Sequence, residues 1–213
     1  MIRLDVFSDP VCPWCLIGKT NLDRALAQHP GHPFAVEWHP FQLNPDMPAG
    51  GMGRAEYLGA KFGGADRLKA IEERLREFAA KAGAELDPSA PVRVPNTLDA
   101  HRLIHWAGLE GRQTEIVSAL FRAYWSEGRD IGAAGVLADI AAECGMDRAV
   151  TLRLLQSDAD ASDIAARDAS ARARGVQAVP TFLIARQYVV SGAQPPEVWG
   201  QIIEELMQQA GNT

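Results

Sequence analysis

Cys12-Pro13-Trp14-Cys15 is the stretch that decides the fold, because it places two cysteines three positions apart directly after a predicted β-strand. Residues 2–8 alternate apolar and polar side chains, as half-buried strands do, and the pattern stops at Asp9-Pro10. A helix is predicted from Cys12, since proline suits a first helical turn and apolar residues recur at helical spacing over residues 16–26. The chain therefore begins with a strand, a short turn and a helix that starts at a pair of thiols.

The start of this helix gives the cysteine pair its expected chemistry. The first N–H groups of a helix have no partner within it and favour an anion, so we expect Cys12 to be partly thiolate at neutral pH. Cys15 lies one turn further on and faces the same side, about 5–6 Å away, which is within the reach of a disulfide. The pair is predicted to be a redox-active dithiol.

Other uses of these residues agree less well with the sequence. A zinc site needs more ligands, and the remaining cysteine, Cys144, stands alone in a helical region, where we expect a small buried residue at a helix end. A structural disulfide would need an oxidising compartment and is unusual in a chain with a large core. His101 and His105 share one predicted helix but lack a third ligand, so we expect ordinary helix-face residues and no metal site.

Composition limits the class of protein. The 213 residues are 47% hydrophobic, enough for a full core in one domain, with or without an insertion. A net charge of -6 without a basic stripe argues against nucleic acid as a partner. Arg3 and Asp5 already lie in the first predicted strand, and no stretch approaches membrane-spanning length. With Met1 as the native start, we expect a cytoplasmic protein with no membrane partner, where a cysteine pair is more often catalytic than structural.

The rest of the chain is predicted to complete an α/β fold. A second strand is expected at residues 34–41, a hairpin at 181–191 and a last helix at 195–209. Between them the periodicity is helical, with candidate helices at 54–63, 65–82, 97–109, 113–127, 132–144, 147–156 and 159–174.

This order, β-α-β, then helices, then β-β-α, is the thioredoxin fold with a large all-helical insertion. The predicted domains are a thioredoxin-like domain of residues 1–53 and 175–213 and an inserted helical domain of residues 54–174. Asn96 is predicted to be the N-cap of one inserted helix, with Asp99 three residues later. Four tryptophans are expected in the core, namely Trp38, Trp106, Trp125 and Trp199.

Several motifs together resemble the DsbA-like branch of the thioredoxin superfamily, and most closely its cytoplasmic FrnE-type subgroup. They are residues 6–9, 11–15, 17–19, 96–103, 175–182 and 191–194. The resemblance implies a thiol–disulfide oxidoreductase or isomerase in which Cys12 is the nucleophile and Cys15 the resolving thiol. It also implies that Pro180 is a cis-proline against the dithiol, with Val179 offering backbone groups to a bound peptide or thiol.

Other expectations follow from this assignment. Pro13 and Trp14, between the thiols, are expected to form part of the substrate surface. The substrate is expected to be a disulfide-containing protein or a small thiol, with no bound cofactor, with glutathione as candidate redox partner, and with the protein a monomer or homodimer. Thioredoxin and DsbA carry a buried carboxylate where this chain has Val6. Asp9 is the nearest acidic candidate here, and the proton acceptor stays unassigned.

Two alternatives remain open on the sequence. The related 2-hydroxychromene-2-carboxylate isomerases and kappa-class glutathione transferases bind glutathione and have a serine in place of Cys12, and Asn96, Arg102 and the Ser191 loop offer groups for such a ligand. A non-enzymatic binding module is the other alternative, because Met47 and Met52 would suit an adaptable apolar groove.

Overall fold

The computed structural model describes residues 1–211, and strand β1 lies inside its four-stranded sheet. The strands of this sheet run in the order β2 (Phe34–Pro40), β1 (Ile2–Ser8), β5 (Thr181–Ile184) and β6 (Tyr188–Ser191). β2 is parallel to β1, whereas β5 is antiparallel to β1 and β6 is antiparallel to β5. Segments from both ends of the chain therefore meet in one sheet, and the protein has the thioredoxin fold that the sequence predicts.

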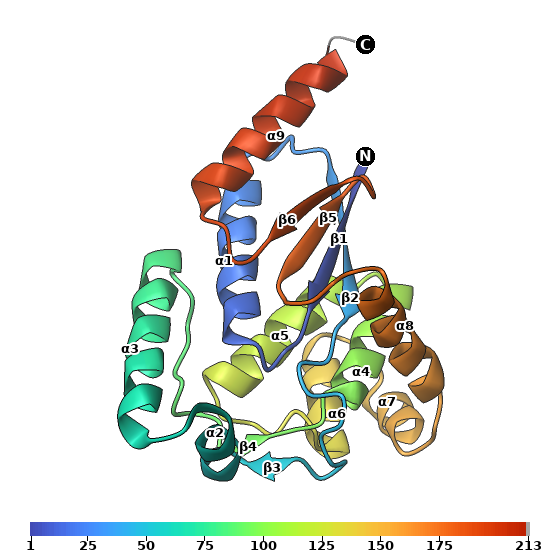
Figure 1. Cartoon of the computed structure of the whole chain (residues 1–213). Helices are drawn as coiled ribbons and strands as arrows, with labels where there is room; N and C mark the ends of the chain where they lie inside the picture. The colour runs from blue at the N-terminus through green and yellow to red at the C-terminus, as the bar shows by residue number, and fades with distance from the viewer. Residues whose placement is uncertain (212–213) are drawn as a thin grey trace.

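Helices pack on both sides of the sheet (Figure 1). α1 (Pro13–Gln28) and α9 (Pro196–Gly211) contact each other on one side, where the rings of Phe182 and Trp199 lie 4.8 Å apart between centroids. Both rings are fully buried, so they anchor α9 to the sheet. α8 (Ala161–Ala173) lies on the other side and contacts β2.

The segment between β2 and β5 is mainly helical. Its helices are α2 (Arg54–Phe62), α3 (Ala65–Ala82), α4 (Leu98–Leu109), α5 (Gln113–Trp125), α6 (Ala134–Glu143), α7 (Arg148–Leu155) and α8. Each lies close to its predicted bounds, while the domain boundaries themselves stay predictions. Two short strands that the sequence does not reveal, β3 (Met52–Gly53) and β4 (Arg93–Val94), pair with each other, because two residues are too few to show an alternating pattern. None of the helices in residues 1–211 combines the length and hydropathy of a membrane-spanning segment.

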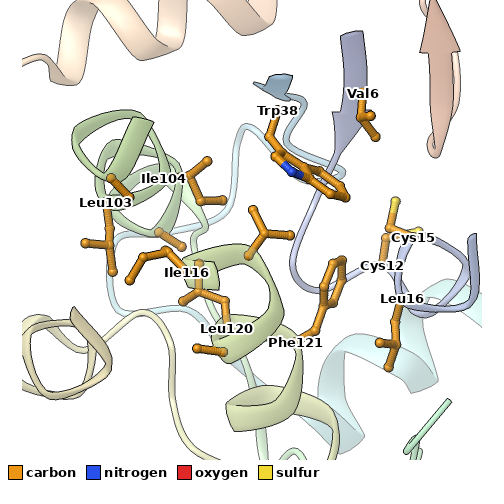
Figure 2. Packing of buried hydrophobic residues seen from close by; sticks show 14 of the residues in the cluster. Val6, Cys12, Cys15, Leu16, Trp38, Leu103, Ile104, Ile116, Leu120 and Phe121 are labelled. Atoms are coloured by element: carbon orange, nitrogen blue, oxygen red, sulfur yellow. The ribbon is translucent and has the colours of Figure 1, made fainter. Parts of the chain in front are cut away.

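One apolar cluster joins the sheet to α4 and α5 and extends to the two cysteines. Figure 2 shows Trp38 and Phe121 between Cys12 and Cys15 on one side and Ile104 of α4 on the other. The four tryptophans expected in the core are all buried, at 0–7% exposure. The dithiol is thus built directly on the main core, which limits how far it can move.

The start of α4 differs from the prediction. Thr97, and not Asn96, is the N-cap residue, while the Asn96 side-chain oxygen accepts a hydrogen bond from Leu98 N at 2.9 Å. The Asn96 amide nitrogen donates to the Met47 carbonyl at 2.7 Å, and Gln42 Nε2 donates to the Asn96 oxygen at 3.1 Å. Asn96 therefore holds the loop after β2 against the helix, a use that a local capping pattern cannot show.

Gln113 occupies the outer edge of β2. Its side-chain oxygen accepts a hydrogen bond from Trp38 N at 2.9 Å, and its amide nitrogen donates to the Trp38 carbonyl at 3.1 Å. A neighbouring strand would make the same pair of hydrogen bonds at this position. The Trp38 indole also donates to Thr114 Oγ1 at 3.0 Å, so the start of α5 is fixed to the sheet edge.

We expect Gln113→Ala to lower the free energy of unfolding by about 1–3 kcal/mol, because it leaves two partly buried backbone groups of Trp38 without partners. Gln113→Glu keeps the acceptor for Trp38 N but loses the donor to the Trp38 carbonyl, so it should also lower the free energy of unfolding. Urea unfolding measures both variants. Gln201→Ala, at an exposed position of α9, is the matched control and should change little. Equal stability of Gln113→Ala and Gln201→Ala would show that the edge contact contributes nothing.

Candidate active site

The two cysteines occupy the N-terminal end of α1. Cys12 is the N-cap residue, with φ -90° and ψ 113°, and Pro13 takes the first helical position. The Cys12 carbonyl accepts hydrogen bonds from Cys15 N at 3.1 Å and from Leu16 N at 3.3 Å. The two cysteines are free and approach each other to 3.4 Å. The start of the helix therefore brings the two thiols together, in keeping with their spacing in the sequence.

The two thiols differ in their surroundings. Both are buried, Cys12 at 3% and Cys15 at 1% exposure, but Cys12 borders a groove and Cys15 lies behind it. Burial raises the pKa of the Cys15 thiol well above its ordinary value, and the adjacent Cys12 adds to the rise. The Asp9 backbone N–H and the Ser8 hydroxyl act in the opposite direction. Cys15 must therefore lose its proton inside the protein before it can act as a nucleophile.

The loop before β5 lies against Cys12. The Val179–Pro180 peptide bond is cis, which is the geometry that the family resemblance implies. The Cys12 thiol points at the Val179 carbonyl oxygen, with 3.6 Å between Sγ and O. Gly192 N donates to the Pro180 carbonyl at 2.8 Å and holds this loop in place. The structure thus brings both loop residues, Val179 and Pro180, beside the cysteines.

Gly18 allows this loop to pack closely on α1. A Cβ atom at Gly18 would lie 2.9 Å from Pro180 Cγ and 3.3 Å from the Ala193 Cα. No side chain fits there, so the cis-proline loop rests on the backbone of the helix. Sequence reasoning gave Gly18 no role of its own, although a glycine inside a predicted helix is a signal of close packing.

A groove of about 530 Å³ opens in front of Cys12. It lies between the start of α1, the Val179 loop and helices α2 and α3, and it is lined mainly by apolar and aromatic side chains. Among the predicted site residues, Cys12, Pro13, Trp14 and Val179 border it, while Cys15 and Pro180 lie outside its lining. Trp14 is half-buried and its ring meets Phe78 edge-on, with 5.2 Å between centroids.

Three cationic side chains also line the groove. Arg54 forms an ion pair with Glu72. Lys61 and Arg74 have no carboxylate partner in residues 1–211; Lys61 Nζ lies 2.6 Å from the Tyr57 hydroxyl, and Arg74 lies over the Phe78 ring. An apolar ligand that carries a carboxylate would therefore meet both hydrophobic and charged partners here.

Asp9 is a fully buried carboxylate in the loop that leads to the cysteines. Its Oδ2 accepts a hydrogen bond from Leu43 N at 2.6 Å, and its Oδ1 accepts one from Val11 N at 3.4 Å. Its backbone carbonyl accepts from Cys12 N at 2.9 Å. Burial raises the pKa of Asp9 to about 7, although the backbone hydrogen bonds limit the rise. Asp9 thus fixes the active-site loop and changes its charge near neutral pH.

His101 contradicts the expectation of an ordinary helix-face residue, because it is only 3% exposed. Its Nε2 lies 3.7 Å from Asp9 Oδ1, too far for a hydrogen bond, and has no hydrogen-bond partner within residues 1–211. Burial lowers the pKa of His101 to about 4, so the ring is neutral at pH 7. His105 is only partly buried and lies 3.4 Å from the Arg167 guanidinium, between Nδ1 and Nη1.

Other residues named from the sequence are engaged elsewhere. The guanidinium of Arg102 is buried and donates to the carbonyls of Leu154, Ser157 and Ala159 at 2.7 Å each, so it does not face the groove. Asn96, as described above, joins two loops. Neither Arg102 nor Asn96 lines the groove, so a ligand in it would not meet them, and Ser191 lies in β6 outside the groove lining.

Met47 and Met52, the methionines suggested for an apolar groove, and Cys144 also lie away from the groove. Met47 is buried and Met52 half-buried, and neither borders it. Cys144 lies at the end of α6 as expected, but it is half-buried where full burial was expected.

Asp5, Glu37 and His39 offer ligand atoms within 4.8 Å of one another on neighbouring strands. Arg3 lies among them, with its guanidinium 2.6 Å from Asp5 Oδ1 and 3.0 Å from Glu37 Oε2. The Arg3 guanidinium therefore already balances the negative charge of these carboxylates, and we interpret the group as an ion-pair network.

A thioredoxin sheet, a helix that begins at two cysteines and a cis-proline loop beside them define a thioredoxin-fold protein with a dithiol site. The DSBA-like thioredoxin domain matches residues 3–204, and the chain belongs to this family of DsbA-like oxidoreductases. A probable DsbA oxidoreductase from Streptomyces coelicolor is 30% identical, over 96% of this chain and 89% of that one, with a TM-score of 0.84.

Two more distant structures share the fold. A 2-hydroxychromene-2-carboxylate isomerase is 17% identical, over 99% of this chain and 98% of that one, with a TM-score of 0.74. The cytosolic disulfide reductase DsbM from Pseudomonas aeruginosa, determined with GSH, is 21% identical, over 97% of this chain and 99% of that one, with a TM-score of 0.69.

Gly18→Ala should push the Pro180 loop away from α1, because its Cβ would overlap Pro180 Cγ. We expect a loss of about 1–3 kcal/mol in the free energy of unfolding, offset in part by the better helix propensity of alanine, and slower thiol–disulfide exchange. Gly59→Ala in α2, where a Cβ meets no atom within 4 Å, is the control and should be as stable as the wild type or more so. A Gly18→Ala protein with unchanged exchange rate and stability would rule out this close packing.

The opposite pKa shifts of Asp9 and His101 predict a specific pH dependence of stability. Asp9, with its pKa raised from 3.8 to about 7, contributes stability that is full below pH 3.8 and is lost as the pH rises through 7. His101, with its pKa lowered from 6.5 to about 4, contributes stability that is full above pH 6.5 and is lost as the pH falls through 4. Between about pH 4 and 6.5 the two slopes cancel in the wild type.

Removing either group should expose the slope of the other. Relative to the wild type, His101→Gln should lose roughly 3 kcal/mol as the pH rises from about 4 to 6.5, and Asp9→Asn should lose a similar amount as the pH falls over that range. Urea unfolding at several pH values measures both. Parallel stability curves for the wild type and both variants would contradict the assigned shifts.

Proposed function

We propose that this protein is a thiol–disulfide oxidoreductase that works as a reductase or isomerase through Cys12 and Cys15. The observation that carries the proposal is the position of Cys12, which borders the groove from the N-terminus of α1 while Cys15 lies directly behind it. Membership of the DSBA-like family supports the same chemistry.

The proposed reaction consists of two exchanges. The Cys12 thiolate attacks one sulfur of a substrate disulfide, and the other sulfur leaves with the electron pair of the broken bond. Cys15, after losing its proton, attacks Cys12 Sγ in the mixed disulfide, which forms the Cys12–Cys15 disulfide and releases the second substrate sulfur as a thiolate. The substrate gains two electrons and the protein loses two. The reverse sequence oxidises a dithiol. In isomerisation, a thiol of the substrate attacks the mixed disulfide after the first exchange, which forms a different substrate disulfide and frees the Cys12 thiolate.

The groove indicates the class of substrate. Its apolar lining suits the side chains that flank a disulfide in a partly unfolded protein, and the backbone of Val179 offers hydrogen bonds to an extended chain. Lys61 and Arg74 suit the carboxylates of a small thiol such as glutathione, which is the proposed redox partner in place of a bound cofactor. Pro13 and Trp14 form the surface next to the reacting sulfur. A cytoplasmic location would favour the reductase direction.

Reduction of a model protein disulfide in glutathione buffer tests this function. Cys12→Ser should lower the rate to background, because the attacking sulfur is lost. Cys15→Ser should accumulate the mixed disulfide between Cys12 and the substrate, visible by mass spectrometry. Cys144→Ser, which removes the cysteine remote from the groove, should behave as the wild type.

A different result would favour the second candidate function, a glutathione-dependent isomerase. The 2-hydroxychromene-2-carboxylate isomerase shares the fold of this chain. In that case the wild type would show no exchange with protein disulfides, and Cys12→Ser would still bind glutathione, since a hydroxyl is sufficient at that position in an enzyme that activates the thiol of its ligand.

A further inference from the structure

Two buried polar atoms close to Asp9 lack hydrogen-bond partners within residues 1–211: Ser8 Oγ and His101 Nε2. Ser8 is the last residue of β1 and is 6% exposed, and its hydroxyl is close enough to Cys15 to lower the pKa of that thiol. His101 comes from α4, and its Nε2 lies 3.7 Å from Asp9 Oδ1. A buried polar atom without a partner costs about 1–3 kcal/mol, so two of them in one place need an explanation.

Both residues line the same small internal cavity of about 10 Å³. Its remaining walls are mainly apolar, and Figure 2 shows three of them, Trp38, Ile104 and Phe121, around this region. A cavity with roughly 10–15 Å³ open to the centre of a water molecule can hold one water, provided that polar partners surround it. Ser8 Oγ and His101 Nε2 supply two partners, and Asp9 Oδ1, at 3.7 Å from Nε2, lies close to the second.

We propose that one water molecule bound between Ser8 Oγ and His101 Nε2 connects the Cys15 thiol to the His101–Asp9 pair and carries the proton that Cys15 must release. This inference rests on the proposed function, since it concerns the second exchange at the same site. It adds Ser8 and His101 as residues that move a proton, and Asp9 as the carboxylate that stabilises the protonated ring.

The relay moves one proton in three transfers. The Cys15 sulfur gives its proton to the Ser8 oxygen, the Ser8 hydroxyl gives its own proton to the water, and the water gives one to His101 Nε2. One proton has then moved from Cys15 to His101, where ionised Asp9, 3.7 Å away, stabilises the charged ring. The Cys15 thiolate next attacks Cys12 Sγ, and the departing substrate sulfur takes a proton from solvent. Reduction of the Cys12–Cys15 disulfide returns the proton by the same path.

Asp9 suits the role of counter-ion to a protonated His101 because it titrates in the working range. Burial raises the pKa of Asp9 to about 7, so a large part of it is ionised at neutral pH and able to stabilise the charged ring. The titratable groups that face it are His101 from α4, Tyr124 from α5 and Asp168 from α8. Asp168 is paired with Arg172 at 2.9 Å, which reduces its effect on Asp9.

A reaction with one equivalent of 5,5′-dithiobis(2-nitrobenzoic acid) separates the two exchanges, because each releases one coloured thiolate. In the reduced Cys144→Ser protein, the first release reports attack by Cys12 and the second reports attack by Cys15 on the mixed disulfide. Ser8→Ala and His101→Gln should slow the second release roughly a hundredfold at pH 7 and leave the first unchanged. With rising pH the second release should accelerate through about 7 in the parent protein, and this inflection should be absent in His101→Gln.

Matched controls are Ser118→Ala on α5 and His105→Gln, one turn from His101 on α4; both should match the parent protein. Equal slowing of both releases, or an unchanged second release in Ser8→Ala and His101→Gln, would overturn the relay. Absence of a first release in the parent protein would instead overturn the proposed function. A crystal structure that resolves ordered waters should show one between Ser8 and His101, and side chains collapsed into this space would overturn the water site.

Discussion

The pairing of β1 with β5 is the constraint on which the site depends. In their antiparallel register Phe7 lies opposite Thr181, so the end of β1 meets the start of β5. The turn that leads to Cys12 and the Val179–Pro180 loop must therefore emerge at the same edge of the sheet. Slipping this register by one residue would turn the apolar side of β5 away from α1 and α9 and separate the cis-proline loop from the thiol. The chemistry of two cysteines close in sequence is thus fixed by a strand that lies far along the chain.

Position relative to the groove gives the two thiols different tasks, because both cysteines are buried but only Cys12 borders the groove. The same core that fixes the cysteines removes Cys15 from water, which protects it from direct reaction and makes its ionisation costly. Within residues 1–211, the two carboxylates closest to Cys15 in the sequence at the end of β1 are engaged elsewhere. Asp5 is taken up by Arg3 and His39, and Asp9 points to Leu43 N and Val11 N. The helices between β2 and β5 supply the rest of the environment, namely His101 beside Asp9 and the groove wall of α2 and α3 in front of Cys12.

The sequence predicts the features that local patterns encode. The strand before Cys12, the helix from Pro13, the helices between residues 54 and 174 and the position of Pro180 all follow from spacing, turn residues or motif likeness, and the fold agrees with them. It does not predict contacts between distant segments. The burial of His101 depends on how α4 packs against β2 and its neighbouring helices. The close approach at Gly18 depends on the Pro180 loop, and Asn96 joins two loops where a local pattern suggested a cap. Periodicity shows which face of a helix is apolar, but not which polar group will lie opposite it.

The side chain of Gln113 has a consequence for the protein among its neighbours in a crowded solution. An unpaired strand edge is a template on which another chain can add a strand and begin aggregation. At Trp38 both backbone groups are already taken by the Gln113 amide, and the helix behind it excludes an incoming chain. The sheet is therefore closed at this point by one side chain in place of a fifth strand, so β2 can border the core without serving as a site for uncontrolled association.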